Sequence, residues 1–219
     1  MLFYIGEIFK RFSEAERSVY PFVLPRGKAF LLNSEASVIM DYKALLMDEA
    51  QMRRSLARIT HEIIEKNKGC DGIMLMGVKR RGVHLASILA QNIKKFEDVD
   101  VPVGYIDISL YRDDLSEIDT GAKTSDCHFP ESVAERTVII VDDVIYTGRT
   151  TRAAIEAVFA EGRPRSIQLV VLIDRGHREL PIKPDYVGKN VPTSHEETVC
   201  VEVLDVDGFF RVVLKDKNK

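Results

Sequence analysis

The chain has 219 residues, of which 45% are hydrophobic and 30% are charged. These values are typical of an ordinary globular protein with one domain, or with one domain and an appendage. Lys and Arg number 31 and Asp and Glu number 34, so the formal net charge is −3. Long disorder, collagen and coiled-coil arrays are excluded. Any contact with nucleic acid must come from a local basic patch, because the protein as a whole is not basic.

The three cysteines Cys70, Cys127 and Cys200 are widely spaced and form no CxxC pair. Neither a disulfide framework nor a structural zinc site is indicated, so we expect no metal site of the protein's own. A reducing cytosol is the simplest compartment for such a chain. No apolar run reaches the ~18 residues that a membrane span needs, and the first residues lack the pattern of a signal peptide. We therefore expect a cytoplasmic protein without a membrane partner.

The first 39 residues differ from the rest, since they contain Pro21, Pro25 and Gly27 but no sustained hydrophobic period. We expect residues 1–39 to be a poorly ordered N-terminal extension. Residues 40–219 are expected to form the folded domain.

Helical and β-rich segments alternate from Asp48 onwards. Asp48 is a candidate N-cap with Gln51 three residues later, and Gly69 ends the helix that follows. Helices are expected over 48–68, 83–95 and 150–161, and strands over 73–78, 103–110, 137–141 and 166–173. A loop is expected over 181–192, and an antiparallel pair over 199–204 and 209–214. This alternation predicts an α/β fold with a mostly parallel central sheet and helices on both faces.

Chemistry is expected at the carboxyl ends of the parallel strands, where such sheets bind ligands. The buried strand 137–141 leads directly into the paired carboxylates Asp142 and Asp143 and then into a turn with Thr147 and Gly148. Carboxylates can accept hydrogen bonds from a sugar diol, while glycine amides and a helix N-terminus bind phosphate. The sequence contains neither a Walker loop nor a G-x-G-x-x-G motif. This pattern predicts a site for a phosphorylated sugar.

The block 138–151 resembles the motif that binds phosphoribosylpyrophosphate (PRPP) in type I phosphoribosyltransferases. Three further blocks, 107–115, 172–181 and 185–194, are similar to the family of bifunctional pyrimidine operon regulators that are also uracil phosphoribosyltransferases. The resemblance covers about residues 40–219, which it identifies as the phosphoribosyltransferase domain. It implies the type I phosphoribosyltransferase fold with a flexible lid loop. It also implies an enzyme that makes UMP and diphosphate from uracil and PRPP, with Mg²⁺ carried by PRPP.

The resemblance implies roles for particular residues around PRPP. Asp142 and Asp143 would hold the ribose hydroxyls, and the loop 77–82 would bind pyrophosphate. Arg112 would act from the lid that begins at Tyr111 and closes over the site. Together the residues implied to bind PRPP or the nucleotide are Lys79, Arg80, Arg81, Asp142, Asp143, Val144, Ile145, Tyr146, Thr147, Gly148, Arg149 and Thr150.

The base is expected to be a pyrimidine. Purine-using relatives often have an aspartate where this chain has Tyr146, and a tyrosine is a poorer base near neutral pH. Tyr146 packing on the sugar is the alternative. Tyr186 and Val187 align with a segment that stacks on the base and offers backbone hydrogen bonds, although Tyr186 could equally belong to the core.

The resemblance also implies regulation by transcription attenuation, in which a protein holding UMP or UTP binds the leader mRNA of pyrimidine operons. Arg54, Arg58 and His61 share one face of the first predicted helix. The implied RNA contacts are completed by Arg178, Lys183 and Lys189. Ala57 departs from the pattern, since a hydroxyl is expected there in members that bind RNA.

Two alternatives stay open. One is an RNA-binding regulator that uses the nucleotide pocket only as a sensor, and the other is a phosphoribosyltransferase for another base without an RNA role. The resemblance further implies a homo-oligomer, either a dimer or a tetramer.

Overall fold

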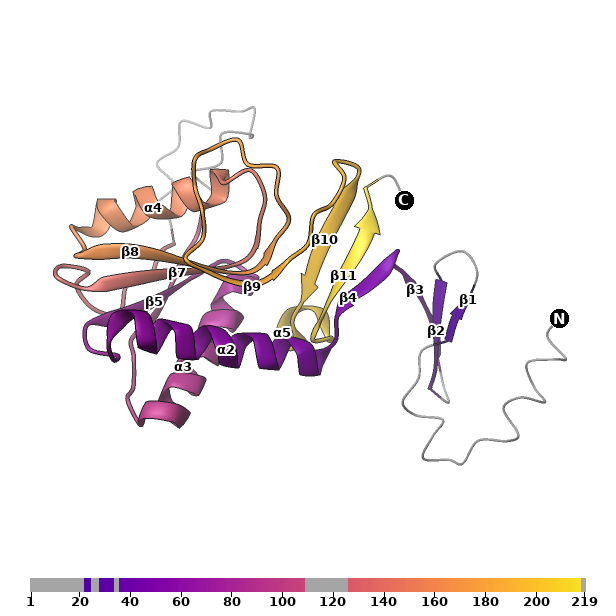
Figure 1. Ribbon diagram of the computed structural model, residues 1–219, viewed down its shortest axis with the longest axis horizontal. Helices are drawn as coiled ribbons and strands as arrows, with labels where there is room; N and C mark the ends of the chain where they lie inside the picture. Colours follow the sequence, from indigo (N-terminus) through magenta and orange to yellow (C-terminus); the bar gives the residue numbers. More distant parts are fainter. Residues whose placement is uncertain (1–21, 25–27, 34–35, 109–125, 218–219) are drawn as a thin grey trace, which may run out of the picture.

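The structure, a computed structural model, describes residues 22–24, 28–33, 36–108 and 126–217. Its centre is a parallel sheet of five strands in the order β6-β5-β7-β8-β9 (Figure 1). These strands are β5 Ile73–Val78, β6 Val103–Ile106, β7 Thr137–Ile145, β8 Ser166–Asp174 and β9 Tyr186–Asn190.

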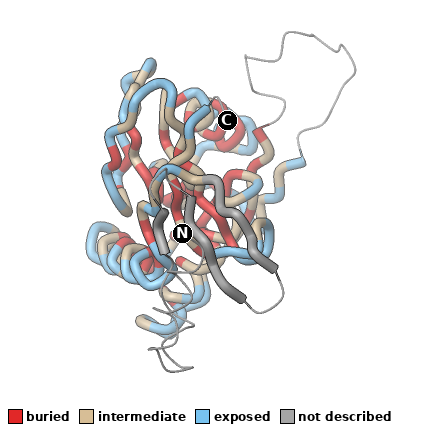
Figure 2. The backbone as a smooth tube through the Cα atoms, turned by 90° about the vertical axis from the view of Figure 1, so that its right-hand side faces the viewer, coloured by how far each residue is buried: buried red, intermediate tan, exposed pale blue. Residues whose placement is uncertain are grey.

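Helices cover both faces of this sheet. Successive residues of each strand point to opposite sides, so the apolar strands present side chains to both faces, and both must be covered. Figure 2 shows the buried residues along the strands, between the more exposed helices. On one face Leu75 and Ile139 belong to the same core cluster as residues of α2 Glu49–Asn67 and α3 Arg81–Glu97. On the other face Met76 and Ile140 belong to a cluster with residues of α4 Arg149–Glu161. The predicted α/β class is therefore confirmed.

The predicted capping box at the start of α2 is present. The Gln51 amide donates to Asp48 Oδ1 at 2.7 Å, and the Asp48 amide donates to Gln51 Oε1 at 2.9 Å. At the other end Lys68 has a left-handed backbone with φ of 57°, followed by Gly69. Local sequence thus sets both ends of this helix.

A second, antiparallel sheet has the order β10-β11-β4. It consists of β4 Ala44–Met47, β10 Glu197–Glu202 and β11 Arg211–Asp216, with the short helix α5 Leu204–Asp207 between β10 and β11. The predicted antiparallel pair is confirmed, but it is joined through α5 and the residues around it instead of a tight turn.

A third sheet, β1-β2-β3, is formed by β1 Phe22–Leu24, β2 Lys28–Asn33 and β3 Ala36–Asp41, all antiparallel. Strand β3 crosses the boundary that we placed between residues 39 and 40. The division into an extension and a domain stays a prediction.

Three expectations about local structure need correction. The strand expected over 103–110 is shorter, because β6 ends at Ile106. The segment 181–192 is not all loop, because β9 pairs with β8 there. This short strand contains Gly188 and two exposed polar residues, so only its tertiary partner identifies it. Strand β7 also continues past Val141 and includes both aspartates. Arg112 and most of the predicted lid lie outside the described residues. Among the helices that are described, none is long and apolar enough to span a membrane.

Candidate active site

The paired aspartates lie in the last part of β7, at the carboxyl end of the central sheet. Asp142 Oδ1 accepts the Asp143 amide at 2.9 Å, and Asp143 Oδ1 accepts the Val144 amide at 2.8 Å, which fixes both side chains. Asp142 is only 7% exposed. Burial raises the pKa of Asp142 well above its usual value, and the neighbouring carboxyl adds to this rise. Burial also raises the pKa of Asp143, while the charge of Arg81 opposes that change. Two partly desolvated carboxyl groups on a rigid strand are suited to accepting hydrogen bonds from hydroxyl groups of a ligand.

The predicted phosphate loop joins β7 to α4. Ile145 is buried at the end of the strand, and Gly148 takes a φ of 96°, a conformation that favours glycine. The N-cap residue of α4, Gly148, makes no side-chain hydrogen bond to the helix, and the Arg149 amide donates to Thr147 Oγ1 at a long 3.4 Å. The N-terminus of α4 is therefore only weakly capped and suits an anion. The Thr147 carbonyl accepts the amides of Glu179 and Leu180, which holds the loop in place.

The predicted pyrophosphate loop lies beside the acid pair. It connects β5 to α3, and the peptide bond between Lys79 and Arg80 is cis. A Cβ at Gly82 would lie 2.3 Å from the Val141 carbonyl oxygen, so only glycine allows this close approach to β7. The fold thus brings the two predicted PRPP-binding segments together at the carboxyl ends of the neighbouring strands β5 and β7.

Three of the four cations predicted to bind PRPP are paired with carboxylates. Lys79 Nζ lies 2.5 Å from Asp126 Oδ2 and 3.6 Å from Asp107 Oδ2. Arg81 makes a bidentate pair with Asp207 of α5, with Nη2–Oδ1 at 2.7 Å and Nε–Oδ2 at 3.0 Å. Arg149 Nη2 lies 2.8 Å from Glu179 Oε2. Arg80 is exposed and has no polar partner in the described part of the chain. The cationic side of the site is therefore largely neutralised by the protein itself.

Tyr146 lies in a cluster that sequence reasoning missed. Its phenol oxygen lies 3.1 Å from His195 Nδ1, and the guanidinium of Arg175 lies 4.3 Å from its ring centroid. The ring of His177 is 5.6 Å from Tyr146 and 4.0 Å from His195, measured between centroids. Arg178 donates to the Tyr146 carbonyl at 2.8 Å. No local signal could have found His195, because it comes from the segment between β9 and β10.

Tyr186 lies differently from the stacking role expected of it. Its side chain is 3% exposed in the core cluster beneath α2, and its hydroxyl donates to Gln168 Oε1 at 2.7 Å. Asn67 of α2 also donates to that hydroxyl at 3.3 Å. Burial raises the pKa of Tyr186 to about 12. The ring packs between α2 and the sheet, which supports the alternative that Tyr186 belongs to the core. The Val187 side chain packs on the opposite face, and its carbonyl accepts Arg58 Nη2 at 2.8 Å, so a role of its backbone in binding the base stays a prediction.

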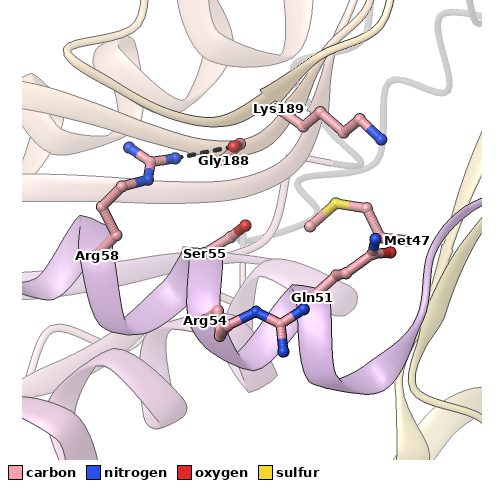
Figure 3. Close-up of a pocket in the computed structure, with 7 residues that line it drawn as sticks. All are labelled: Met47, Gln51, Arg54, Ser55, Arg58, Gly188 and Lys189. Atoms are coloured by element: carbon pink, nitrogen blue, oxygen red, sulfur yellow. Dashed lines mark hydrogen bonds between the residues drawn. The ribbon is translucent and has the colours of Figure 1, made fainter.

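The cations predicted to bind RNA lie in two places. Arg54, Arg58 and Lys189 line one pocket of about 360 Å³ between α2 and β9 (Figure 3). The other lining residues are Met47, Gln51, Ser55 and Gly188. Arg58 Nη1 also pairs with Glu62 Oε1 at 2.5 Å, on the next turn of α2. Arg58 Nη2 donates to the carbonyls of Val187 and Gly188, both at 2.8 Å, and Lys189 Nζ donates to the Leu46 carbonyl at 2.8 Å.

The remaining predicted RNA contacts surround this basic pocket or lie apart from it. His61 is on the next turn of α2, where it stacks on Phe96 with centroids 4.4 Å apart. Lys183 is exposed. Arg178 lies by the strand-end loops instead, because it binds Asp174 and the carbonyls of Tyr146 and Ile182.

Comparisons with known proteins now identify the family. Residues 46–205 match the phosphoribosyl transferase domain. The protein named Bifunctional protein PyrR in Acetivibrio thermocellus is 52% identical over 177 residues, which are 81% of this chain and 96% of that protein. Its namesake in Clostridium kluyveri is 56% identical over 168 residues, 77% of this chain and 94% of that protein. The chain belongs to the PyrR family. This confirms the predicted family of bifunctional proteins and the prediction of a phosphoribosyltransferase enzyme.

The fold of this PyrR family member is shared with more distant enzymes. The crystal structure of the hypoxanthine phosphoribosyltransferase of Trypanosoma cruzi superposes with a TM-score of 0.63 at 22% identity, covering 80% of this chain and 97% of that one. At this level of identity the likeness concerns the fold alone. The type I phosphoribosyltransferase architecture predicted from the sequence is confirmed.

Proposed function

We propose that this PyrR family member transfers the phosphoribosyl group of PRPP to uracil, and that its uridine nucleotide complex binds the leader mRNA of pyrimidine operons. The contact that carries the first part is the approach of the loop 77–82 to the end of β7, where a Cβ at Gly82 would lie 2.3 Å from the Val141 oxygen. It places the basic loop beside the end of β7, which carries the acid pair and leads to the N-terminus of α4. We call the space between these three segments the proposed crevice. PRPP has three matching parts, which are a pyrophosphate, a diol and a 5′-phosphate.

Each part of the crevice has a proposed task. Asp142 and Asp143 accept hydrogen bonds from the ribose hydroxyls, while Thr147 to Thr150 cradle the 5′-phosphate. Arg80 and Arg81 neutralise the leaving pyrophosphate. As uracil N1 bonds to C1′, the bond between C1′ and the pyrophosphate oxygen breaks and the N1 proton passes to solvent. Positioning and charge neutralisation account for the acceleration.

The donor set fits Mg²⁺ that arrives with PRPP better than a resident ion. In the described residues no group of three or more His, Cys, Asp or Glu side chains is arranged to hold a metal. Asp142 and Asp143 offer hard oxygen ligands, and the remaining ligands would come from substrate and water. Bound in this way, Mg²⁺ would supply positive charge to the pyrophosphate.

Tyr146 supports uracil as the base. Its side chain stands next to the phosphate loop, where purine-using relatives often have an aspartate, and its hydroxyl is paired with His195. The test is an assay of purified protein with PRPP and uracil, compared with hypoxanthine and orotate. Formation of UMP alone supports the proposal. Formation of another nucleotide points to the alternative enzyme, and UMP binding without turnover points to the sensor.

The basic pocket supports the RNA part. Three cations line this pocket, and although Arg58 is paired with Glu62, its lining holds basic groups that can bind phosphates. Because Arg58 binds the carbonyls of Val187 and Gly188, the pocket shares β9 with the proposed base site. The test is binding of a leader hairpin with and without UMP. Binding that does not respond to UMP would contradict nucleotide-dependent regulation.

The other partner and location assignments follow from the same proposal. An enzyme that consumes PRPP and binds transcripts works in the cytoplasm, where both occur. We also propose a homo-oligomer, a dimer or tetramer, which light scattering of the purified protein would test.

A further inference from the structure

Arg81 and Asp207 form an unusually specific contact for residues 126 positions apart. Arg81 is the first residue of α3 and lies in the proposed pyrophosphate loop, whereas Asp207 is the last residue of α5. Nε and Nη2 of the guanidinium both donate to the carboxylate, at 3.0 and 2.7 Å. The side chains are 37% and 18% exposed, so this pair is partly withdrawn from solvent.

Asp207 is itself fixed. Its Oδ2 accepts the Val203 amide at 2.9 Å, and its own amide donates to the Val203 carbonyl at 2.8 Å. The hydrogen bond from Arg81 holds the pKa of Asp207 below its usual value, and the charge of Arg81 adds to this, which keeps the carboxylate ionised. The carboxylate is therefore a fixed acceptor beside the crevice.

The bidentate pair leaves three N–H groups of the Arg81 guanidinium for a second anion. A guanidinium has five N–H groups, and Asp207 takes one from Nε and one from Nη2. Three remain, on Nη1 and on the other side of Nη2. That second edge matches two oxygens of a phosphate group.

We propose that Asp207 is a positioning residue for the phosphoribosyl transfer, which holds one edge of Arg81 so that the other edge receives the pyrophosphate of PRPP. The inference rests on the proposed function, since it takes pyrophosphate as the ligand of the loop 77–82. It also assigns a role to α5, which connects the antiparallel sheet β10-β11-β4 to the crevice. Without Asp207, Arg81 samples other rotamers and loses side-chain entropy when pyrophosphate binds.

The experiment measures the binding of magnesium pyrophosphate by calorimetry and the KM for PRPP by assay. We expect Asp207→Ala to weaken pyrophosphate binding and to raise the KM for PRPP by about 10-fold, the equivalent of one lost charged hydrogen bond. Asp207→Asn, which keeps one acceptor oxygen, should have a smaller effect of the same sign. The kcat should change less than the KM.

A second background separates positioning from a structural role. In Arg81→Ala protein, Asp207→Ala should weaken pyrophosphate binding no further, because the side chain it positions is gone. A persistent effect there would show that Asp207 only supports the fold, and would overturn the inference. The matched control is Asp98→Asn, which breaks the pair with Lys94 at the far end of α3 and should leave pyrophosphate binding unchanged.

Other results would also overturn the inference. Tighter pyrophosphate binding by Asp207→Ala would mean that the carboxylate competes with the ligand, and unchanged binding would mean that it does nothing. Pyrophosphate binding does not depend on the base. A protein that binds pyrophosphate in this Asp207-dependent way but makes no UMP would therefore refute the uracil proposal and leave this inference standing.

Discussion

The phenol oxygen of Tyr146 lies 3.1 Å from Nδ1 of His195, although 49 positions separate the two residues. The contact ties the loop after β7 to the segment before β10. Neither residue's environment could be read from its neighbours in the chain. The loop predicted to bind ribose and phosphate is therefore held in place by a hydrogen bond to a residue distant in the sequence.

We expect Tyr146→Phe and His195→Ala each to lower the free energy of unfolding by about 1 kcal/mol, the usual net contribution of one hydrogen bond. The double variant should lose less than the sum of the two single variants, because both remove the same hydrogen bond, while His195→Ala also removes the ring contact with His177. Urea unfolding measures all three. Fully additive losses would show that the two side chains act independently.

The acid pair gives a prediction about activity. Changing both Asp142 and Asp143 to Asn should lower kcat/KM for PRPP by roughly 100-fold or more, since hydrogen bonds to charged groups contribute about 1.5–3 kcal/mol each. The far-ultraviolet circular dichroism spectrum should stay the same, because Asn has the same shape. Retained activity in the double variant would show that the sugar binds elsewhere.

The same pair gives a prediction about pH. Burial raises the pKa of Asp142 above the unfolded value of about 3.8, so the native state binds more protons than the unfolded state. The free energy of unfolding should therefore fall as the pH rises from about 4 through the raised folded pKa. Asp142→Asn should remove much of this slope and be more stable than the wild type at pH 8. Parallel pH profiles of the two proteins would contradict this account of Asp142.

The close approach of Gly82 to β7 can be tested by a substitution that adds one methyl group. Gly82→Ala should destabilise the protein by about 1–3 kcal/mol and reduce PRPP use, because its Cβ would meet the Val141 carbonyl oxygen at 2.3 Å. The control is Gly162→Ala, where the backbone is extended and the new Cβ meets only a Val133 methyl group at 3.0 Å. Equal behaviour of both variants in thermal unfolding and assay would refute the steric argument.

The basic pocket predicts separable functions. Arg58→Ala combined with His61→Ala should abolish binding of a leader hairpin while UMP synthesis continues. Arg58→Ala alone should reduce the slope of log affinity against log salt by about 1, if its guanidinium contacts one phosphate. Arg53→Ala is the control, because it removes the same kind of pair on the same helix, Arg53 with Glu49 instead of Arg58 with Glu62, but outside the pocket. Equal loss of catalysis and RNA binding in the double variant would mean that this face of α2 is structural.

Local sequence predicted the elements whose signals are local. The capping box at Asp48 and the bounds of β5 follow from residues within a few positions of each other. Strand β9 was not predicted, because a short polar segment becomes a strand only by pairing with β8. The direction of Tyr186 was equally hidden, since the register that opposes it to Val170 decides which face it joins.

The sequence by itself determined the acid pair, the glycine turn and the helix that follows, since these lie within one continuous stretch from 142 to 150. It also determined the family, because the segments 107–115, 138–151, 172–181 and 185–194 resemble motifs of that family. Only the tertiary structure decided which polar groups meet, such as Arg81 with Asp207 and Arg58 with the carbonyl of Val187. The physical reason is that hydrogen bonds and ion pairs act over a few ångströms in space. Sheet register and helix packing, not distance along the chain, determine which groups come that close.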